Sequence, residues 1–144
     1  MISKDNFKLS IIIPCYNEKD TIEVILEKVI KSLNDHKFLN YEILIVDDHS
    51  KDGTSELLKN LNSRERINIY FHESNLGKGA SIQTAIKHVT GDIILIQDAD
   101  LEYDPFDYKK LLIPFFEANA DVVYGSRFLG GSKYVRVHFF WHYL

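Results

Sequence analysis

The stretch Glu42-Ile43-Leu44-Ile45-Val46-Asp47-Asp48 decides the fold, because in it a short apolar run ends at two adjacent carboxylates. An apolar run over Glu42–Val46 without polar alternation predicts a strand that is buried on both faces. Similar runs occur elsewhere in the chain, at Leu9–Ile13, Ile67–Phe71, Asp92–Ile96 and Asp121–Tyr124. Together they predict five short strands of one sheet.

Segments with helical spacing separate these strands. Apolar residues recur every three or four positions in Glu18–His36, in the stretch through Leu57, Leu58 and Leu61, in Gly77–Val89 and in Asp107–Ala118. We expect Thr21 or Asp20 to cap the first helix, and Pro114 to kink or split the last one. Strands that alternate with helices predict an α/β domain, with a mostly parallel sheet flanked by helices on both faces.

Composition excludes several classes of function. The chain has 144 residues, the size of one domain, and a formal net charge of −4. It lacks the basic stripe of a nucleic-acid binder, so we expect no nucleic-acid partner. Its one cysteine excludes an internal disulfide. No secretory segment is visible, and the apolar runs are far below the ~20 residues of a membrane-spanning helix. These features predict a cytoplasmic protein.

Polar clusters follow the predicted strands at their carboxyl ends. In parallel sheets those ends meet at one edge, which is where ligands bind. The clusters are Tyr16-Asn17-Glu18, Asp47-Asp48, the segment from His72 to Gly79, and Asp98-Ala99-Asp100. Their shared position is the strongest indication of a functional site in this sequence.

The pair Asp98 and Asp100 predicts a divalent-cation site. Two carboxylates one residue apart can be directed at one hard cation, and Mg²⁺ or Mn²⁺ is commonly held by one or two carboxylates together with substrate phosphates. Such a cation neutralises a diphosphate leaving group. We expect Glu102 to be a third ligand or an outer partner. The alternative for this segment is a solvated acidic turn.

The clusters after the first two strands suggest a pocket for a nucleoside. Tyr16 offers a flat ring to a base, and Glu18 offers a hydrogen-bond acceptor. We expect Asp48 to accept hydrogen bonds from a base or ribose. The alternative is that Asp47 and Asp48 are a pair of loop acids, one of which caps the following turn through Ser50 or Asp52. Cys15 is expected to be a small buried residue rather than a reactive thiol.

Two cationic residues are candidates for phosphate binding. Lys78 lies in a glycine-containing loop, Asn75–Ala80, which opens a helix; free amides at a helix start attract phosphate. This loop lacks the spacing of a P-loop. Arg127 follows the last predicted strand, and its guanidinium could donate hydrogen bonds to a phosphate or sugar oxygen. The alternatives are an ordinary glycine-assisted turn and a surface arginine.

The end of the sequence differs in character from the rest. Gly130-Gly131-Ser132 predicts a flexible joint, and aromatic residues crowd the segment that follows. We therefore divide the chain into a core at 1–131 and the start of an acceptor-site or membrane-proximal region at 132–144. The aromatic segment, with Lys133 and Arg136, suggests contact with a membrane surface, and an incomplete core edge explains it equally well. We expect the sequence to be the N-terminal part of a longer protein.

Five motifs in order resemble those of family 2 glycosyltransferases, which have the GT-A fold, a Rossmann-like fold that binds nucleotide sugars. The motifs are Ser10–Glu18, Glu42–Ser50 with Asp52-Gly53-Thr54, Asn75–Gly79, Gly91–Asp100 and Val123–Arg127. Each motif is loose alone, and the ordered set is specific. Asp-Ala-Asp-Leu at 98–101 and Gly-Ser-Arg at 125–127 most resemble the dolichyl- or polyprenyl-phosphate sugar synthases of the family.

This resemblance implies roles for individual residues. The nucleotide pocket would be lined by Pro14, Tyr16, Glu18 and Asp48, and Lys78 would join it. Asp98 and Asp100 would hold the metal. Arg127 would face the phosphates or the acceptor, so that Asp100 and Arg127 would be the catalytic residues.

The resemblance also implies an activity. It indicates an inverting, metal-dependent hexosyltransferase that moves a sugar from a GDP- or UDP-linked donor to a polyprenyl phosphate, such as dolichyl or undecaprenyl phosphate, at the inner face of a membrane. Glu102 stands where mannose synthases often carry glutamine, which leaves the donor sugar open. One alternative is a family 2 transferase that acts on a glycan hydroxyl in polysaccharide or lipopolysaccharide synthesis. Another is a truncated nucleotide-binding remnant without activity.

Overall fold

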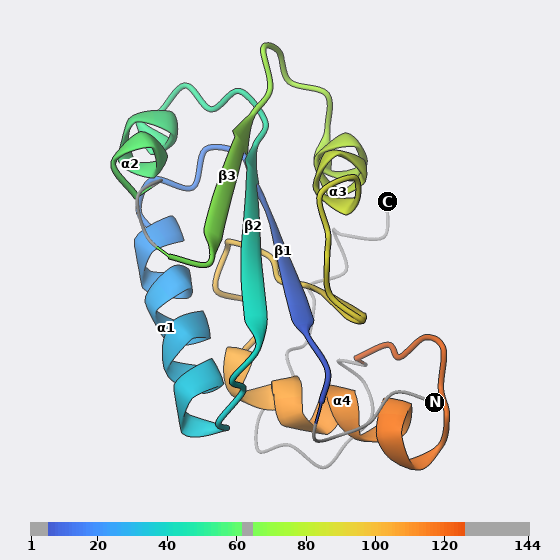
Figure 1. Cartoon of the computed structure of the whole chain (residues 1–144). Coiled ribbons are helices and arrows are strands. Elements are labelled where there is room, and N and C mark those ends of the chain that lie inside the picture. The colour runs from blue at the N-terminus through green and yellow to red at the C-terminus, as the bar shows by residue number, and fades with distance from the viewer. Residues whose placement is uncertain (1–5, 62–64, 126–144) are drawn as a thin grey trace, which may run out of the picture.

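The computed structural model describes residues 6–61 and 65–125. Their strands form one parallel sheet in the order β3-β2-β1-β4 (Figure 1). The strands are β1 (Leu9–Cys15), β2 (Tyr41–Asp47), β3 (Ile67–Phe71) and β4 (Ile93–Ile96). The first four strands predicted from the sequence are therefore confirmed, with ends that differ by up to two residues.

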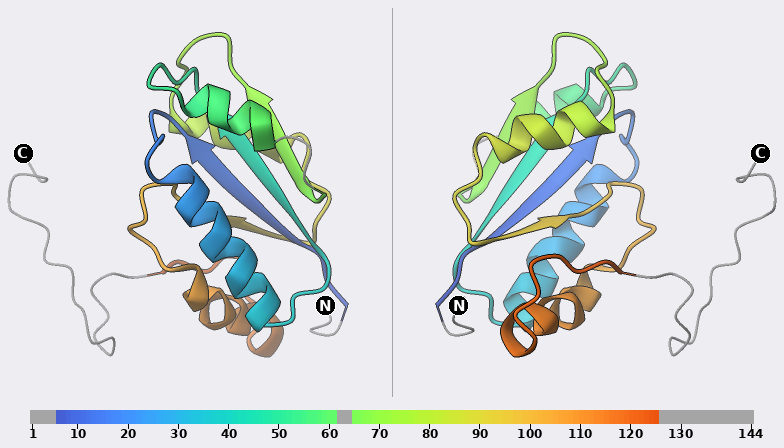
Figure 2. Two further views of the ribbon diagram at one scale, coloured as in Figure 1. Left: turned by 90° about the vertical axis from the view of Figure 1, so that its left-hand side faces the viewer. Right: turned by 90° about the vertical axis from the view of Figure 1, so that its right-hand side faces the viewer.

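Helices cover both faces of the sheet, as Figure 2 shows. They are α1 (Ile22–Asp35), α2 (Thr54–Leu61), α3 (Lys78–Ile86), the 3₁₀ turn η1 (Pro105–Asp107) and α4 (Tyr108–Glu117). Ile11, Ile13 and neighbouring strand residues pack against α1, α2 and α4 in the larger apolar core. On the opposite face Ile12 and its strand neighbours pack against α3 in a smaller core. The expected α/β architecture is confirmed.

The fifth predicted strand is wrong. Asp121–Tyr124 forms no strand with any other segment of the described chain. Val122 and Tyr124 are exposed, at 63% and 88%. A short apolar run becomes a strand only where a ladder partner and a core are available, and this run has neither among residues 6–61 and 65–125.

Two expectations about the helices are corrected in part. Thr21 occupies the N-cap position of α1, but its side chain makes no cap hydrogen bond; the hydroxyl donates instead to the backbone carbonyl and the carboxylate of Glu18. Pro114 does not split α4, which continues through it from Tyr108 to Glu117, and a kink at Pro114 stays a prediction.

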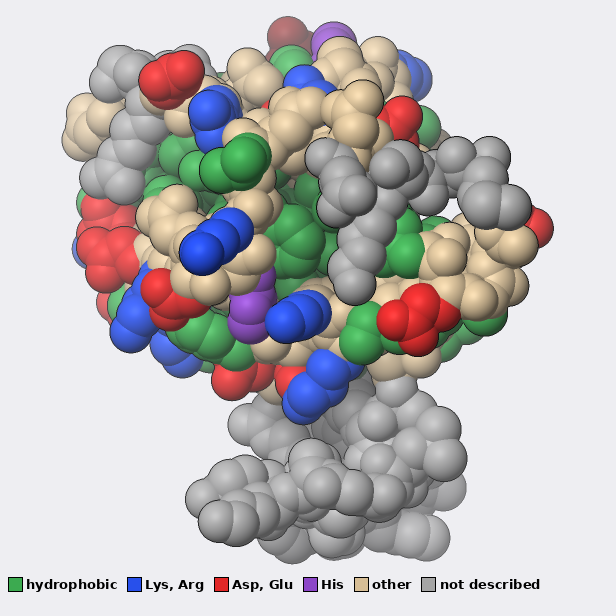
Figure 3. Space-filling view, turned by 60° about the horizontal axis from the view of Figure 1, so that its bottom comes forward, with side chains coloured by type: hydrophobic (Ala, Val, Ile, Leu, Met, Phe, Trp, Pro, Cys, Tyr) green, Lys and Arg blue, Asp and Glu red, His purple; other side chains and the backbone are tan. Residues whose placement is uncertain are grey.

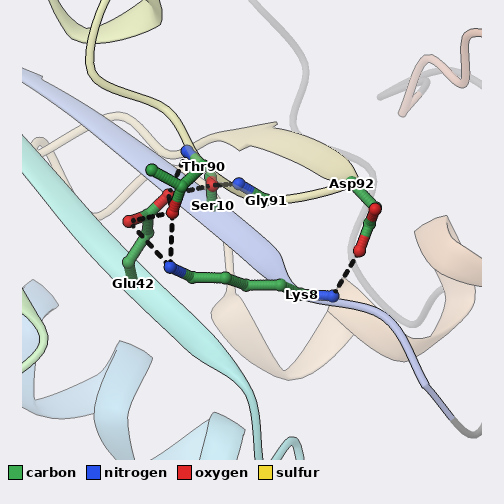
Figure 4. Close-up of polar contacts among 6 residues, drawn as sticks. All are labelled: Lys8, Ser10, Glu42, Thr90, Gly91 and Asp92. Carbon is green, nitrogen blue, oxygen red and sulfur yellow. Dashed lines mark hydrogen bonds and ion pairs between the residues drawn. The ribbon is translucent and has the colours of Figure 1, made fainter.

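A polar cluster ties β1, β2 and the segment before β4 together at the end of the sheet where these strands begin (Figure 4). Glu42 accepts hydrogen bonds from the Ser10 hydroxyl at 2.6 Å, the Thr90 amide at 2.7 Å and the Lys8 ammonium at 3.1 Å. Gly91 donates its amide to Ser10 Oγ. Burial would raise the pKa of Glu42, but these hydrogen bonds outweigh it and lower the pKa to about 2.

Replacement of Gly91 by alanine should destabilise the fold by about 2 kcal/mol. A Cβ atom at this position would clash with Ser10 Oγ and lie 2.7 Å from the carbonyl oxygen of Lys8, which belongs to the backbone and cannot move cheaply. Urea unfolding of Gly91→Ala measures the loss. Gly79→Ala is the matched control, because a Cβ at Gly79 meets nothing within 4 Å and alanine favours the helix. Equal stability of the two variants would contradict this account of Gly91.

The surface carries charges of both signs. Figure 3 shows one face of the molecule, on which acidic and basic side chains are interspersed around apolar ones rather than collected by sign. Among the described residues, no helix has the length and apolar character needed to span a membrane.

Candidate functional site

Seven of the residues predicted from the sequence line one pocket at the carboxyl ends of the strands. Its wall is formed by Pro14, Cys15, Tyr16, Glu18, Asp48, Lys78, Ser81, Asp98, Ala99 and Asp100. The cavity has a volume of about 180 Å³. Ligand sites commonly enclose ~300–1,000 Å³, so the cavity formed by the described residues is smaller than most of them. Arg127 lies outside the described residues.

The loop after β1 is fixed against the loop after β2. The Asn17 amide donates to Ser50 Oγ at 2.8 Å, and the Asn17 side chain accepts from the Lys51 amide at 2.9 Å. The Glu18 amide donates to Thr54 Oγ1 at 3.0 Å. Asn17 has a φ of 55°, a left-handed conformation that asparagine tolerates better than most residues. These bonds set the position of the pocket residues on either side of Asn17.

The two aspartates at the end of β2 make different interactions. Asp47 is buried and accepts hydrogen bonds from the hydroxyls of Ser50 and Ser55. It therefore has the turn-capping role that the sequence left open as the alternative for this pair. Asp48 lines the pocket and accepts a hydrogen bond from the loop after β3.

Asp48 receives three hydrogen bonds from the described residues. Its Oδ1 accepts from the Leu76 amide at 2.8 Å and lies 2.7 Å from His72 Nδ1, and its Oδ2 accepts from the Gly77 amide at 2.7 Å. Burial would raise the pKa of Asp48, but these donors lower it below its usual value. A carboxylate has about four acceptor positions. Asp48 Oδ2 thus retains capacity for a donor from a ligand.

The loop that carries Asp98 and Asp100 is held from inside the protein by Gln97. The Gln97 amide nitrogen donates to the carbonyls of Asp98 and Tyr103, and its oxygen accepts from the buried Tyr108 hydroxyl at 2.8 Å. Leu101 follows with a φ of 64°, a conformation that costs a residue with a Cβ of order 1 kcal/mol. The strained turn places both aspartates at the pocket.

The donor set of this loop fits a hard divalent cation. Asp98 and Asp100 both line the pocket, and Asp98 Oδ1 lies 2.5 Å from Lys78 Nζ, so this carboxylate already faces a cationic group. Two carboxylates with space for substrate phosphates are typical of Mg²⁺ and Mn²⁺ sites.

Glu102 is placed differently from the two aspartates. It does not line the pocket, and its amide donates to Asp100 Oδ1 at 2.9 Å. Within the described part of the chain, no three His, Cys, Asp or Glu side chains are grouped so that they could hold a metal ion. The role of Glu102 as a third ligand or an outer partner stays a prediction.

Cys15 lines the pocket and is buried. Burial, reinforced by the negative charge of Asp47, raises the pKa of its thiol far above the usual value. The thiol therefore stays protonated at neutral pH, which agrees with the expectation of a small buried residue rather than a nucleophile.

Comparison with known proteins identifies the family. A protein-family model with the description "Glycosyl transferase family 2" matches residues 10–142. This chain belongs to that family. It is 33% identical over 126 residues to a dolichol-phosphate mannosyltransferase of Pyrococcus furiosus, a match that covers 88% of this chain and 35% of the relative. It is 35% identical over 129 residues to a dolichyl-phosphate beta-glucosyltransferase of Trichomonas vaginalis, covering 83% of this chain and 40% of that protein.

A solved structure places this family 2 glycosyltransferase among proteins of the GT-A fold. The mannosyltransferase PcManGT from Pyrobaculum calidifontis, in complex with GDP-Man and Mn²⁺, has a TM-score of 0.58 and 28% identity to this chain. The match covers 70% of this chain and 30% of that one. The chain thus spans well under half the length of the relatives that it matches.

Three polar residues of this family 2 chain had no assigned role at the level of sequence. Ser81, His72 and Gln97 are all largely buried near the pocket. His72 belongs to a polar cluster that the sequence did reveal, but its side-chain partners are Asp48, which follows β2, and Thr84 of α3. Gln97 precedes Asp98 directly, and a polar residue at the end of an apolar strand was the signal that could have marked it.

Proposed function

We propose that this chain is the donor-binding part of an inverting, divalent-metal-dependent hexosyltransferase that acts on a polyprenyl phosphate. The observation that carries the proposal is the pocket that unites Tyr16, Asp48 and Lys78 with Asp98 and Asp100. It combines an aromatic ring and an acceptor suited to a nucleoside with cationic and metal-binding groups suited to a diphosphate. The dolichol- and dolichyl-phosphate relatives support the class of acceptor.

Each side of the pocket would bind one part of the donor. Tyr16 is half exposed, at 46%, so its ring is available to stack on a base. Asp48 Oδ2 would accept a hydrogen bond from the base or ribose. Lys78 and the amides at the start of α3 would face the phosphates. Arg127, outside the described residues, is proposed for the phosphates or the acceptor on the basis of the family resemblance.

The metal is proposed to be held by Asp98 and Asp100. A bound Mg²⁺ or Mn²⁺ neutralises the charge that develops on the diphosphate as it leaves. In this structure Lys78 is the cation that meets Asp98, so Lys78 would move toward the phosphates when a donor is bound. Glu102 is proposed to support the same loop.

The transfer itself is a single displacement. An oxygen of the acceptor phosphate attacks the anomeric carbon opposite the diphosphate; the new C–O bond forms as the bond to the nucleoside diphosphate breaks, which inverts the configuration. A phosphate monoester has a second pKa of about 6 and is largely ionised at neutral pH. The reaction therefore needs no protein base. A polyprenyl acceptor places the reaction at a membrane surface.

Calorimetric titration tests donor binding. The chain is titrated with GDP, UDP, GDP-mannose and UDP-glucose, each with and without Mn²⁺. We expect binding of one base series, strengthened by Mn²⁺, and that series identifies the base. If neither series binds in either condition, this chain does not hold the donor and the proposal fails.

The acceptor is tested with a radiolabelled donor and polyprenyl phosphate in detergent. Label in the solvent-extractable lipid supports the proposed acceptor. Label transferred instead to added oligosaccharide would favour the alternative, a family 2 transferase that acts on a glycan hydroxyl.

A further inference from the structure

His72 lies between the pocket and α3. Its side chain is 8% exposed. Ring nitrogen Nδ1 is 2.7 Å from Asp48 Oδ1, and ring nitrogen Nε2 is 2.9 Å from Thr84 Oγ1. His72 follows β3, Asp48 follows β2, and Thr84 belongs to α3, so one imidazole connects three elements of the fold.

The chemistry of Asp48 determines which ring nitrogen carries a proton. The donors around Asp48 lower its pKa, so the carboxyl is ionised at neutral pH and can only accept hydrogen bonds. Nδ1 of His72 is therefore protonated. In the neutral imidazole Nε2 is then an acceptor, and the Thr84 hydroxyl donates to it. The Thr84 contact thus keeps the ring in the orientation that directs Nδ1 at Asp48.

Asp48, oriented in this way, in turn fixes the loop before α3. Its two oxygens hold the amides of Leu76 and Gly77. Gly77 has a φ of 90°, which a residue with a side chain rarely adopts, and its carbonyl accepts from the Ser81 amide in the first turn of α3. Lys78, which faces Asp98, comes directly after it.

We propose that His72 is a positioning residue of the pocket, which aligns the Asp48 carboxylate and, through the Leu76 and Gly77 amides, the helix start that carries Lys78. The proposal rests on the proposed function, because it treats this pocket as the donor site. It assigns His72 no contact with the donor.

Two isosteric substitutions separate the two contacts of the ring. Asparagine places its amide nitrogen near the position of Nδ1, so His72→Asn keeps a donor to Asp48 and loses Thr84. Glutamine places its amide nitrogen near the position of Nε2, so His72→Gln keeps the contact with Thr84 and loses the one with Asp48. Calorimetry measures the Kd for GDP and for UDP with Mn²⁺, and thermal unfolding measures stability.

We expect His72→Gln to weaken binding of the preferred nucleotide about tenfold or more, since it removes a hydrogen bond to a buried charge. His72→Asn should retain most of the affinity. Ser10→Ala is the matched control, because it removes a buried hydroxyl with two hydrogen bonds at the opposite end of the sheet. It should lower the unfolding temperature without changing the Kd.

Equal affinity of the Gln and Asn variants, or no loss in either, would overturn the proposal, since a merely structural histidine affects stability alone. Amide hydrogen exchange gives a readout that needs no nucleotide. Exchange at Leu76 and Gly77 should accelerate in His72→Gln and not in His72→Asn, and equal exchange in both would also overturn the proposal. If the unsubstituted chain binds neither GDP nor UDP, the proposed function fails, and the exchange rates still decide the positioning role.

Discussion

Replacement of Glu42 by alanine is expected to lower the free energy of unfolding by about 3–5 kcal/mol. The Glu42 side chain is buried, and its carboxylate is the common acceptor for Lys8, Ser10 and the Thr90 amide. Alanine would leave the buried Ser10 hydroxyl and the Thr90 amide without this acceptor and the part-exposed Lys8 without its ion pair. A buried donor without an acceptor costs its full desolvation energy, so the loss exceeds that of an exposed ion pair. Urea unfolding at pH 7 measures it.

The same cluster predicts how stability depends on pH. The pKa of Glu42 is lowered from 4.5 to about 2 in the folded protein, so the folded state binds its proton less readily than the unfolded state. The resulting stabilisation, about 3 kcal/mol, is present above pH 4.5 and is lost as the pH falls toward 2. The difference in stability between the unsubstituted chain and Glu42→Gln should therefore shrink over this range.

Glu42→Gln is also the control for the shape of the side chain. It keeps an oxygen acceptor and nearly the same volume but carries no charge, so its loss at pH 7 should be smaller than that of Glu42→Ala. A loss below about 1 kcal/mol in the alanine variant would show that the cluster contributes little more than an exposed pair.

Asp100→Asn should eliminate the manganese-dependent part of nucleotide-sugar binding. Asparagine has the shape of aspartate, and its carbonyl oxygen can still accept from the Glu102 amide, so the loop should keep its conformation. It removes the charge and one oxygen ligand. Changes in groups that merely support a metal ligand cost 10–100-fold in metal affinity, so loss of a ligand should weaken Mn²⁺-dependent binding by at least about 100-fold.

Asp107→Asn is the matched control for this substitution. Asp107, like Asp100, follows β4 in the chain, but its carboxylate pairs with the exposed Lys110 and does not line the pocket. Nucleotide titrations with and without Mn²⁺, on both variants, give the comparison. Manganese-dependent binding that survives in Asp100→Asn would refute the metal assignment. Equal weakening in both variants would show that the effect is one of net charge.

Much of the pocket could be predicted from the sequence. Tyr16, Asp48, Lys78 and Asp98 belong to clusters that directly follow short apolar runs or open a helix. In a parallel sheet these positions converge at one edge, whatever the details of packing. Order along the chain was therefore enough to predict that they meet, and the structure brings them to a single cavity.

The predictions that failed rested on local sequence patterns, whose structural outcome depends on the segment or side chain that they meet. The run Asp121–Tyr124 resembles the buried strands in composition, but a strand forms only with a neighbouring ladder, and none is present in the part of the chain that the structure describes. Thr21 has the right residue type and position for a cap, yet its hydroxyl donates to Glu18. Residue type alone could not decide between these partners.

The sequence by itself determined the alternation of strands and helices and the edge at which the polar clusters collect, because both follow from the periodicity and order of residues. Only the tertiary structure decided which donors each buried carboxylate receives. Glu42 meets Thr90, and Asp48 meets His72, across 48 and 24 positions of the chain. Such pairs depend on register and helix placement, which arise from packing of the whole core and leave no local pattern in the sequence.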